Sequence, residues 1–157
     1  MAERVKPIEG IAELAHDVVH EYYQNPNRNR QRQVQVTISV SCFIPKPFTP
    51  FQWEAQDTME MLAEKQEYLK TKIKNKHVRY VHHDAKVSRI EAVLARGDRR
   101  LAPVIAELCD KGIMLDAWDE FFNYDAWIEA FKTCGVDPEF YTTRGYGEEE
   151  LLPWDPM

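Results

Sequence analysis

Residues 34–53, VQVTISVSCFIPKPFTPFQW, decide how this chain folds. The stretch begins with strict alternation, which places the side chains of Val34, Val36, Ile38 and Val40 on one face of an extended strand. The opposite face is small and hydroxyl-bearing, and the strand runs into a loop with prolines at 45, 47 and 50. Such a face suits either a strand of an open antiparallel sheet whose polar side is exposed to solvent, or a strand that lines a barrel beside a ligand.

The composition bounds the class of protein. A chain of 157 residues suits one domain that buries a sizeable core. Its net charge of -6 argues against a protein whose whole surface attracts nucleic acid, but it is compatible with a local basic patch. No apolar run approaches the roughly 18 residues of a membrane span, and the first residues lack an apolar signal core. We therefore expect a cytoplasmic chain with no membrane partner.

The hydrophobic pattern predicts an alternation of helices and strands. Long helices between single strands imply parallel strands joined by crossovers, and two strands are too few for a closed sheet. Because a parallel sheet normally has both faces covered, the pattern predicts an α/β chain that is part of a barrel or a doubly wound fold. The predicted helices are 7–24, 54–75, 87–95, 99–111 and 125–134, the predicted strands are 34–41 and 77–83, and the tail 137–157 is irregular.

Two of the predicted helices carry an apolar stripe, and each stripe is a testable prediction of what is buried. In the first helix the stripe is Ile8, Ile11, Ala15, Val18 and Tyr22. In the second it is Ala55, Met59, Leu62, Gln66, Leu69 and Ile73.

His16 and His20 lie four residues apart, so their imidazoles fall on one face of the first helix, as in zinc metalloproteases. The position of the catalytic glutamate holds Asp17, and the sequence offers no obvious third ligand. We therefore favour two histidines on a solvated helix face and assign no metal-binding residue.

His82, His83 and Asp84 close the second strand. In a barrel the carboxyl ends of the strands face the active site, which makes one of these histidines a candidate to contact substrate. Neighbours on a strand point to opposite faces, so both cannot face one ligand without a bend. The alternative, which we favour, is that they end the strand and that Asp84 or Ser88 caps the next helix.

The segment from Arg96 to Arg100, RGDRR, packs three arginines and an aspartate around a glycine. Guanidinium groups bind oxyanions bidentately, so a phosphate or carboxylate clamp is one reading. The other, which we favour, is a turn between two helices with Arg–Asp pairing inside it. Trp118 lies in a loop among carboxylates and is either substrate-binding or the plug of a barrel end.

Several of these blocks together resemble the C-terminal half of a radical S-adenosylmethionine (radical SAM) domain. The resemblance covers nearly the whole chain, and the most similar subgroup is the largely uncharacterised one fused to a cobalamin-binding domain. The blocks that carry it are SVSCFIPKPFTPFQW (39–53), HDAKVSRIEAVLARGDRRLAPVIAELCDKG (83–112), DAWDEFF (116–122), DAWIEAF (125–131) and LPWD (152–155).

The resemblance implies a partial (β/α)6 TIM-like barrel whose first four or five strands are not in this chain. The family's C-x-x-x-C-x-x-C loop binds a 4Fe-4S cluster, which holds the methionine moiety of S-adenosylmethionine; Cys42, Cys109 and Cys134 do not match it. The alternating strand would be the sixth, whose end lies beside the adenine, which implies cofactor contacts at Ser41, Phe43 and Ile44. The expected substrate-side candidates are Ser39, His82, His83, Arg96, Asp98, Arg99 and Trp118.

On this reading residues 1–84 are the last βα units of the barrel and 85–157 are a helical extension packed on it. We expect a fragment of a longer iron–sulfur enzyme, with the remainder of the barrel as its partner. The parent would cleave S-adenosylmethionine reductively to a 5′-deoxyadenosyl radical that acts on an unidentified substrate, and the resemblance is compatible with cobalamin there. By itself the chain should neither hold a cluster nor turn over.

The alternative is a binding or interaction module that folds independently. In that reading the RGDRR turn and the Trp118 loop form a surface for an anionic ligand or a partner protein, and no clear nucleic-acid binding is expected.

Overall fold

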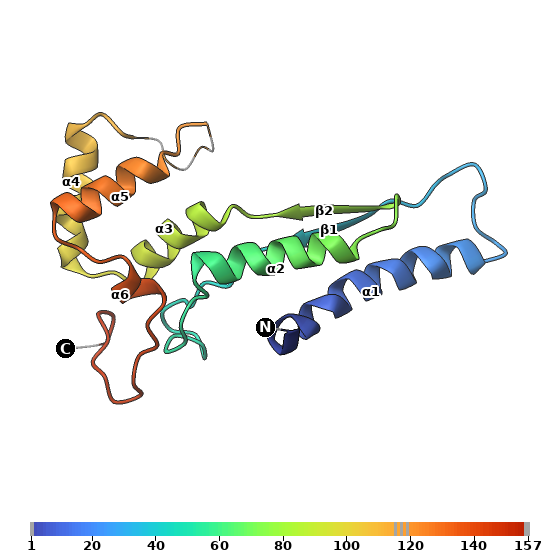
Figure 1. Ribbon diagram of the computed structural model, residues 1–157, viewed down its shortest axis with the longest axis horizontal. Coiled ribbons are helices and arrows are strands. Elements are labelled where there is room, and N and C mark those ends of the chain that lie inside the picture. Colours follow the sequence, from blue (N-terminus) through green and yellow to red (C-terminus); the bar gives the residue numbers. More distant parts are fainter. Residues whose placement is uncertain (1, 115, 117, 119, 156–157) are drawn as a thin grey trace. The chain divides into compact units, whose positions relative to one another are not determined.

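A computed structural model describes residues 2–114, 116, 118 and 120–155 (Figure 1). The chain is mixed α/β, with one parallel two-stranded sheet among these residues. Its contacts divide it into a strand unit (Met1–Cys42 and Glu60–His83) and a helical unit (Phe43–Met59 and Asp84–Met157). The elements are α1 (Ala2–Gln24), β1 (Val36–Val40), α2 (Met59–Lys72), β2 (Val78–His82), α3 (Ala85–Arg96), a 3-10 turn (Arg99–Leu101), α4 (Ala102–Asp110), α5 (Tyr124–Thr133) and α6 (Glu139–Thr142).

The predicted parallel pairing is confirmed. β1 and β2 run parallel in the register Val36↔Val78 to Val40↔His82. The ladder extends past β2, because the His83 N–H donates to the Val40 carbonyl at 3.0 Å. Alternation therefore gives the sheet two different faces.

One face of the sheet forms the core of the strand unit. Ile38 and Val78 are buried there against Ala15 and Val19 of α1. The stripe predicted for the first helix is correct at Ala15, which is buried, but Ile11 and Val18 are 38% and 46% exposed. Their neighbours Ala12 and Val19 are buried instead, so the inward face is displaced by one residue.

The second long helix is shorter than predicted. α2 begins at Met59, and residues 54–58 are not helical. Gln56 explains the difference: its N–H donates to the Thr142 carbonyl at 2.8 Å, and its side-chain amide donates to the carbonyls of Phe43 and Ser88. Tertiary hydrogen bonds therefore hold this segment extended, although its apolar spacing suits a helix.

The helical unit has its own core, built from α3, α4, α5 and α6. Its buried members include Ile90, Val93, Trp127, Phe131 and Tyr141. Gly112 and Gly135, which follow α4 and α5, have positive φ values of 72° and 65°, as the predicted helix ends require. In α4, Val104 and Leu108 are buried, whereas Ile105 is 44% exposed.

The tail beyond residue 137 is more ordered than the sequence suggested. It contains α6, and Tyr141, Thr142, Tyr146 and Leu152 are buried. Along the described part of the chain, no helix has both the length and the apolar content needed to cross a bilayer.

Candidate functional site

The second face of the sheet, which we call the open face, is the clearest candidate site. It carries Thr37 and Ser39 of β1, Arg79 and Val81 of β2, and Ser41 and His83, which directly follow the two strands. All six residues are exposed. A parallel sheet is normally covered on both sides. Here the face opposite α1 stands open, lined by three hydroxyls, one guanidinium and one imidazole.

The backbone of β1 is also open along one edge. The Val36 N–H donates to the His77 carbonyl at 2.8 Å, and the Val40 carbonyl accepts from the His83 N–H. The backbone N–H and C=O groups of every second residue of β1, beginning with Val36, therefore point to β2. In a parallel strand the intervening residues direct their N–H and C=O groups to the other edge. Thr37, Ser39 and Ser41 therefore offer backbone groups to a further strand or ligand.

The two adjacent histidines lie at the carboxyl end of β2 and differ in role. His82 follows Tyr80 on the helix-covered face, and their rings lie 5.3 Å apart. His83 continues the open face, and its carbonyl accepts from the Gln66 amide at 3.0 Å. Asp84 caps α3 through the Lys86 N–H, which confirms the capping alternative for that residue. Of the two histidines, His83 is the one beside Ser41.

The proline loop displays aromatic rings in the helical unit. Phe43 is 45% exposed and meets Phe51 edge-on, with ring centroids 5.9 Å apart, whereas Ile44 is half-buried. Phe48 is 79% exposed and adopts a φ of 60°, a left-handed conformation that a phenylalanine rarely takes. The loop is held by Thr49, whose hydroxyl donates to the Lys46 carbonyl at 2.8 Å.

Arg96, the first arginine of the RGDRR segment, is fully buried. Its guanidinium donates to the carbonyls of Thr142 and Arg144, both at 3.2 Å, and stacks 4.1 Å above the Tyr146 ring. Burial lowers the pKa of Arg96 from its ordinary value. This side chain fastens the tail to α3 and is not available to a ligand.

Asp98 is likewise engaged within the helical unit. It caps the 3-10 turn through the Arg100 N–H, binds the Arg100 guanidinium bidentately, and accepts from the Tyr141 hydroxyl at 3.2 Å. The Arg100 guanidinium lowers the pKa of Asp98 to about 2. Arg99 is exposed and makes no such bond to another residue that the structure describes. The geometry therefore supports the turn that the sequence favoured rather than an anion clamp.

Trp118 is 62% exposed, and its carbonyl accepts from the N–H groups of Phe121 and Phe122. The nearby Trp127 is buried and donates to Asp116 at 3.1 Å. The structure thus separates the two tryptophans into a surface residue and a core residue.

The α1 histidines line a hollow in the strand unit, of about 650 Å³, together with Tyr23, Asn75 and His77. The Tyr23 hydroxyl and the His77 Nε2 are 3.2 Å apart, and the His16 Nε2 is buried without a hydrogen-bond partner among the described residues. Within that same part of the chain, no three His, Cys, Asp or Glu side chains are placed to hold a metal ion.

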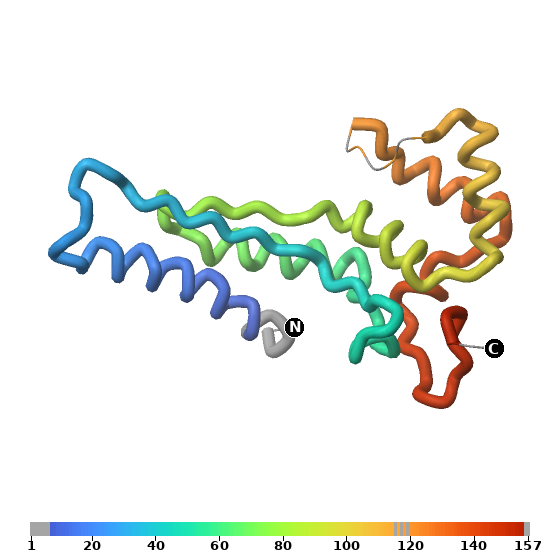
Figure 2. The backbone as a smooth tube through the Cα atoms, turned by 180° about the vertical axis from the view of Figure 1, so that it is seen from behind, coloured from blue at the N-terminus to red at the C-terminus, as the bar shows by residue number. Residues whose placement is uncertain are grey.

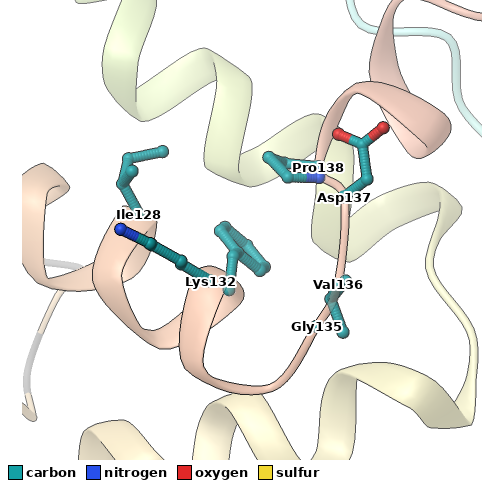
Figure 3. Close-up of a pocket in the computed structure, with 7 residues that line it drawn as sticks. Ile128, Lys132, Gly135, Val136, Asp137 and Pro138 are labelled. Carbon is teal, nitrogen blue, oxygen red and sulfur yellow. The ribbon is translucent and has the colours of Figure 1, made fainter.

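A second hollow, of about 380 Å³, lies on the helical unit beside the end of α5 (Figure 3). Ile128, Phe131, Val136 and Pro138 give it an apolar floor. Lys132 and Asp137 stand at its rim, with opposite charges (Figure 3). Its lining residues include no cysteine, serine, threonine or histidine.

Sequence reasoning missed two members of the open face, Arg79 and Val81. The signal was present, because both alternate with Val78 and Tyr80 along the second strand. It missed Gln66 too, which was placed on an apolar stripe although its amide donates to the His83 carbonyl.

Comparison with known proteins gave no relative for this chain. No protein-family model matches the sequence, no curated protein matches it, and no solved structure matches the fold.

The residues present do not fit an iron–sulfur cluster. Cys42 lies in the strand unit and Cys109 and Cys134 lie in the helical unit, far apart in sequence, and Cys109 is exposed. Of the residues that the resemblance assigned to the cofactor, Ser41 is exposed in the strand unit and Phe43 is exposed in the helical unit.

Proposed function

We propose that this chain is the C-terminal part of a radical SAM enzyme. The parent cleaves S-adenosylmethionine to a 5′-deoxyadenosyl radical, and this radical abstracts hydrogen from a substrate. The resemblance is compatible with cobalamin as a second cofactor of the parent. The cluster that starts this reaction is held by another part of the enzyme, because the cysteines here do not fit it. No step of the radical chemistry is therefore assigned to a residue of this chain.

The observation that carries the proposal is the open face. A parallel sheet of two strands, helix-covered on one side only, leaves Thr37, Ser39 and Ser41 exposed together with the free edge of β1. The barrel half expected from the resemblance would pair with that edge and enclose that face, and it is the partner we propose. Ser39 and Ser41 would then line the interior of the barrel.

In the absence of that half, the exposed edge should cause self-association, since unpaired strands template pairing with other chains. Ser39→Lys places a charge on the open face and should weaken self-association by about tenfold or more, equivalent to ~1.4 kcal/mol. Light scattering across a concentration series measures this. Thr133→Lys, at an exposed position on α5, is the matched control and should leave association unchanged.

Two results would overturn the proposal. A wild-type chain that stays monomeric at all concentrations would show that the open face and the free edge of β1 do not require a partner. Anaerobic reconstitution with iron and sulfide that gave a stoichiometric 4Fe-4S cluster in this chain would contradict the assignment of the cluster to another part.

A second candidate is the independently folding binding module, and the separate core of the helical unit favours it. Its ligand surface would be reduced to Arg99 and Trp118, because Arg96 and Asp98 are engaged internally. A single cooperative unfolding transition of a monomeric wild-type chain supports this candidate over the first.

A further inference from the structure

The amino end of the sheet carries a concentration of positive charge that the proposed function leaves unused. β1 and β2 start in register, and the Val36 N–H donates to the His77 carbonyl, so the segments that precede the two strands lie at the same end of the sheet (Figure 1, Figure 2). One segment brings Arg30 and Arg32, and the other brings Lys74 and Lys76. We call these four residues the basic end.

Charge is distributed unevenly between the two units. The strand unit has eleven lysines and arginines against eight aspartates and glutamates, whereas the helical unit has nine against eighteen. Within the strand unit all acidic residues lie in 3–21 and 60–67, so the stretches 22–42 and 68–83 contain none. The overall charge of -6 thus hides a local basic surface.

The four side chains of the basic end are exposed, and none has an ion-pair partner among the described residues. Their basic neighbours differ in this respect. Lys70 pairs with Glu67, and Lys72 pairs with Glu9 at 2.7 Å. The lysines that precede the basic end are therefore paired with carboxylates, whereas those of the basic end are not.

The loop that carries the arginines is anchored rather than loose. The Tyr22 hydroxyl lies within hydrogen-bond distance of the carbonyls of Asn29 (3.2 Å) and Arg32 (3.0 Å). Asn25 and Asn29 each accept from the N–H two residues further on, which gives two Asx turns. Because these bonds already order the loop, binding of a ligand here costs less conformational entropy of the loop.

We propose that the basic end binds the phosphodiester backbone of a nucleic acid. Arginine forks and lysine ammonium groups both bind phosphate, and nucleic-acid interfaces are polar and strongly positive. Residues 24–33, QNPNRNRQRQ, are amide and guanidinium throughout except for one proline. A protein interface needs an apolar core, and a membrane-surface segment needs apolar side chains to insert; this stretch has neither.

The salt dependence of binding follows from the number of cations. Each phosphate neutralised on a single strand contributes about -0.7 to the slope of log affinity against log salt, so four contacts give about -2.8. At 0.1 M salt each contact is worth about fivefold, so the loss of two reduces affinity by about twenty-fivefold.

The test uses the full chain and fluorescence anisotropy with labelled 20-nucleotide RNA and DNA strands of one sequence. The double variant Lys74→Gln, Lys76→Gln should weaken binding by about twenty-fivefold and halve the salt slope. The double variant Arg30→Gln, Arg32→Gln, in the other segment, should do the same. The matched control removes two exposed lysines of the helical unit, Lys86→Gln and Lys132→Gln, and should change affinity by less than about twofold.

Circular dichroism of each variant checks that the fold is kept, as expected for exposed side chains. Preference for the RNA or the DNA strand identifies which nucleic acid is bound, and either supports the proposal. Three results overturn it: no binding of either strand at low salt, an equal loss in the control variant, or binding to anionic vesicles of phosphatidylcholine and phosphatidylserine without binding to the oligonucleotides.

Discussion

Replacing Asp98 with asparagine should destabilise the helical unit in a pH-dependent way. The Arg100 guanidinium binds this carboxylate bidentately and lowers its pKa from 3.8 to about 2, with the Arg100 N–H adding to the effect and partial burial opposing it. Asparagine keeps an oxygen that can accept from the Arg100 N–H and from Tyr141. The substitution therefore removes the charge and leaves the cap in place.

The size of the effect follows from the pKa difference between the folded and unfolded states. A lowering of this size corresponds to about 2 kcal/mol at pH 7, and the 22% exposure of the Asp98 side chain makes that an upper value. The folded pKa lies below the unfolded one, so the stabilisation is fully present above pH 3.8 and is lost as the pH falls through 2. About half of it should remain near pH 3.

Urea unfolding followed by tryptophan fluorescence measures this in the right part of the chain. All four tryptophans, at 53, 118, 127 and 154, lie in the helical unit, so the signal reports that unit alone. The control is Glu148→Gln, which removes one negative charge at an exposed position. Wild type and Asp98→Asn should differ by about 2 kcal/mol at pH 7 and by about 1 kcal/mol at pH 3.

A difference of the same size at both pH values would refute the reasoning, because it would assign the loss to packing or capping rather than to the charge. A loss of equal size in Glu148→Gln would refute it as well, since net charge would then explain the effect.

Three further changes in the helical unit can be followed by the same fluorescence assay. Gly97→Ala should cost about 1–3 kcal/mol, because a Cβ there would lie 2.7 Å from the Val93 carbonyl oxygen, and a neutral result would contradict the close approach. Phe48→Gly should stabilise by about 1 kcal/mol by relieving the left-handed φ of an exposed residue, and a loss would mean that its ring packs. Gln56→Leu should cost about 1–3 kcal/mol by leaving two carbonyls unpaired, and an unchanged midpoint would count against those bonds.

The sequence predicted the elements that depend on local pattern. Alternation identified both strands, and the long segments between them predicted the parallel pairing. The predicted helices 99–111 and 125–134 stop directly before Gly112 and Gly135, and both glycines have the positive φ typical of a helix end. These signals are reliable because backbone geometry ties side-chain spacing to the face that is buried.

The failures share a physical cause. Residues 54–58 have helical spacing, but Gln56 is bound to carbonyls from two distant segments, which no local pattern reveals. The stripe of α1 was misplaced because alanine and isoleucine both count as apolar, and only packing against Ile38 shows which face lies inward. The tail was expected to be irregular because the partners of Tyr141 and Tyr146 lie in α3 and the turn that follows it.

The candidate site divides along the same line. The sequence by itself determined that one face of the β1 strand is apolar and the other bears Thr37, Ser39 and Ser41, since strand alternation is a property of the backbone. Only the tertiary structure decided that this second face stands open beside His83, and that Arg96 and Asp98 are held within the helical unit. Exposure and pairing depend on which distant segments meet, and spacing along one chain does not encode that.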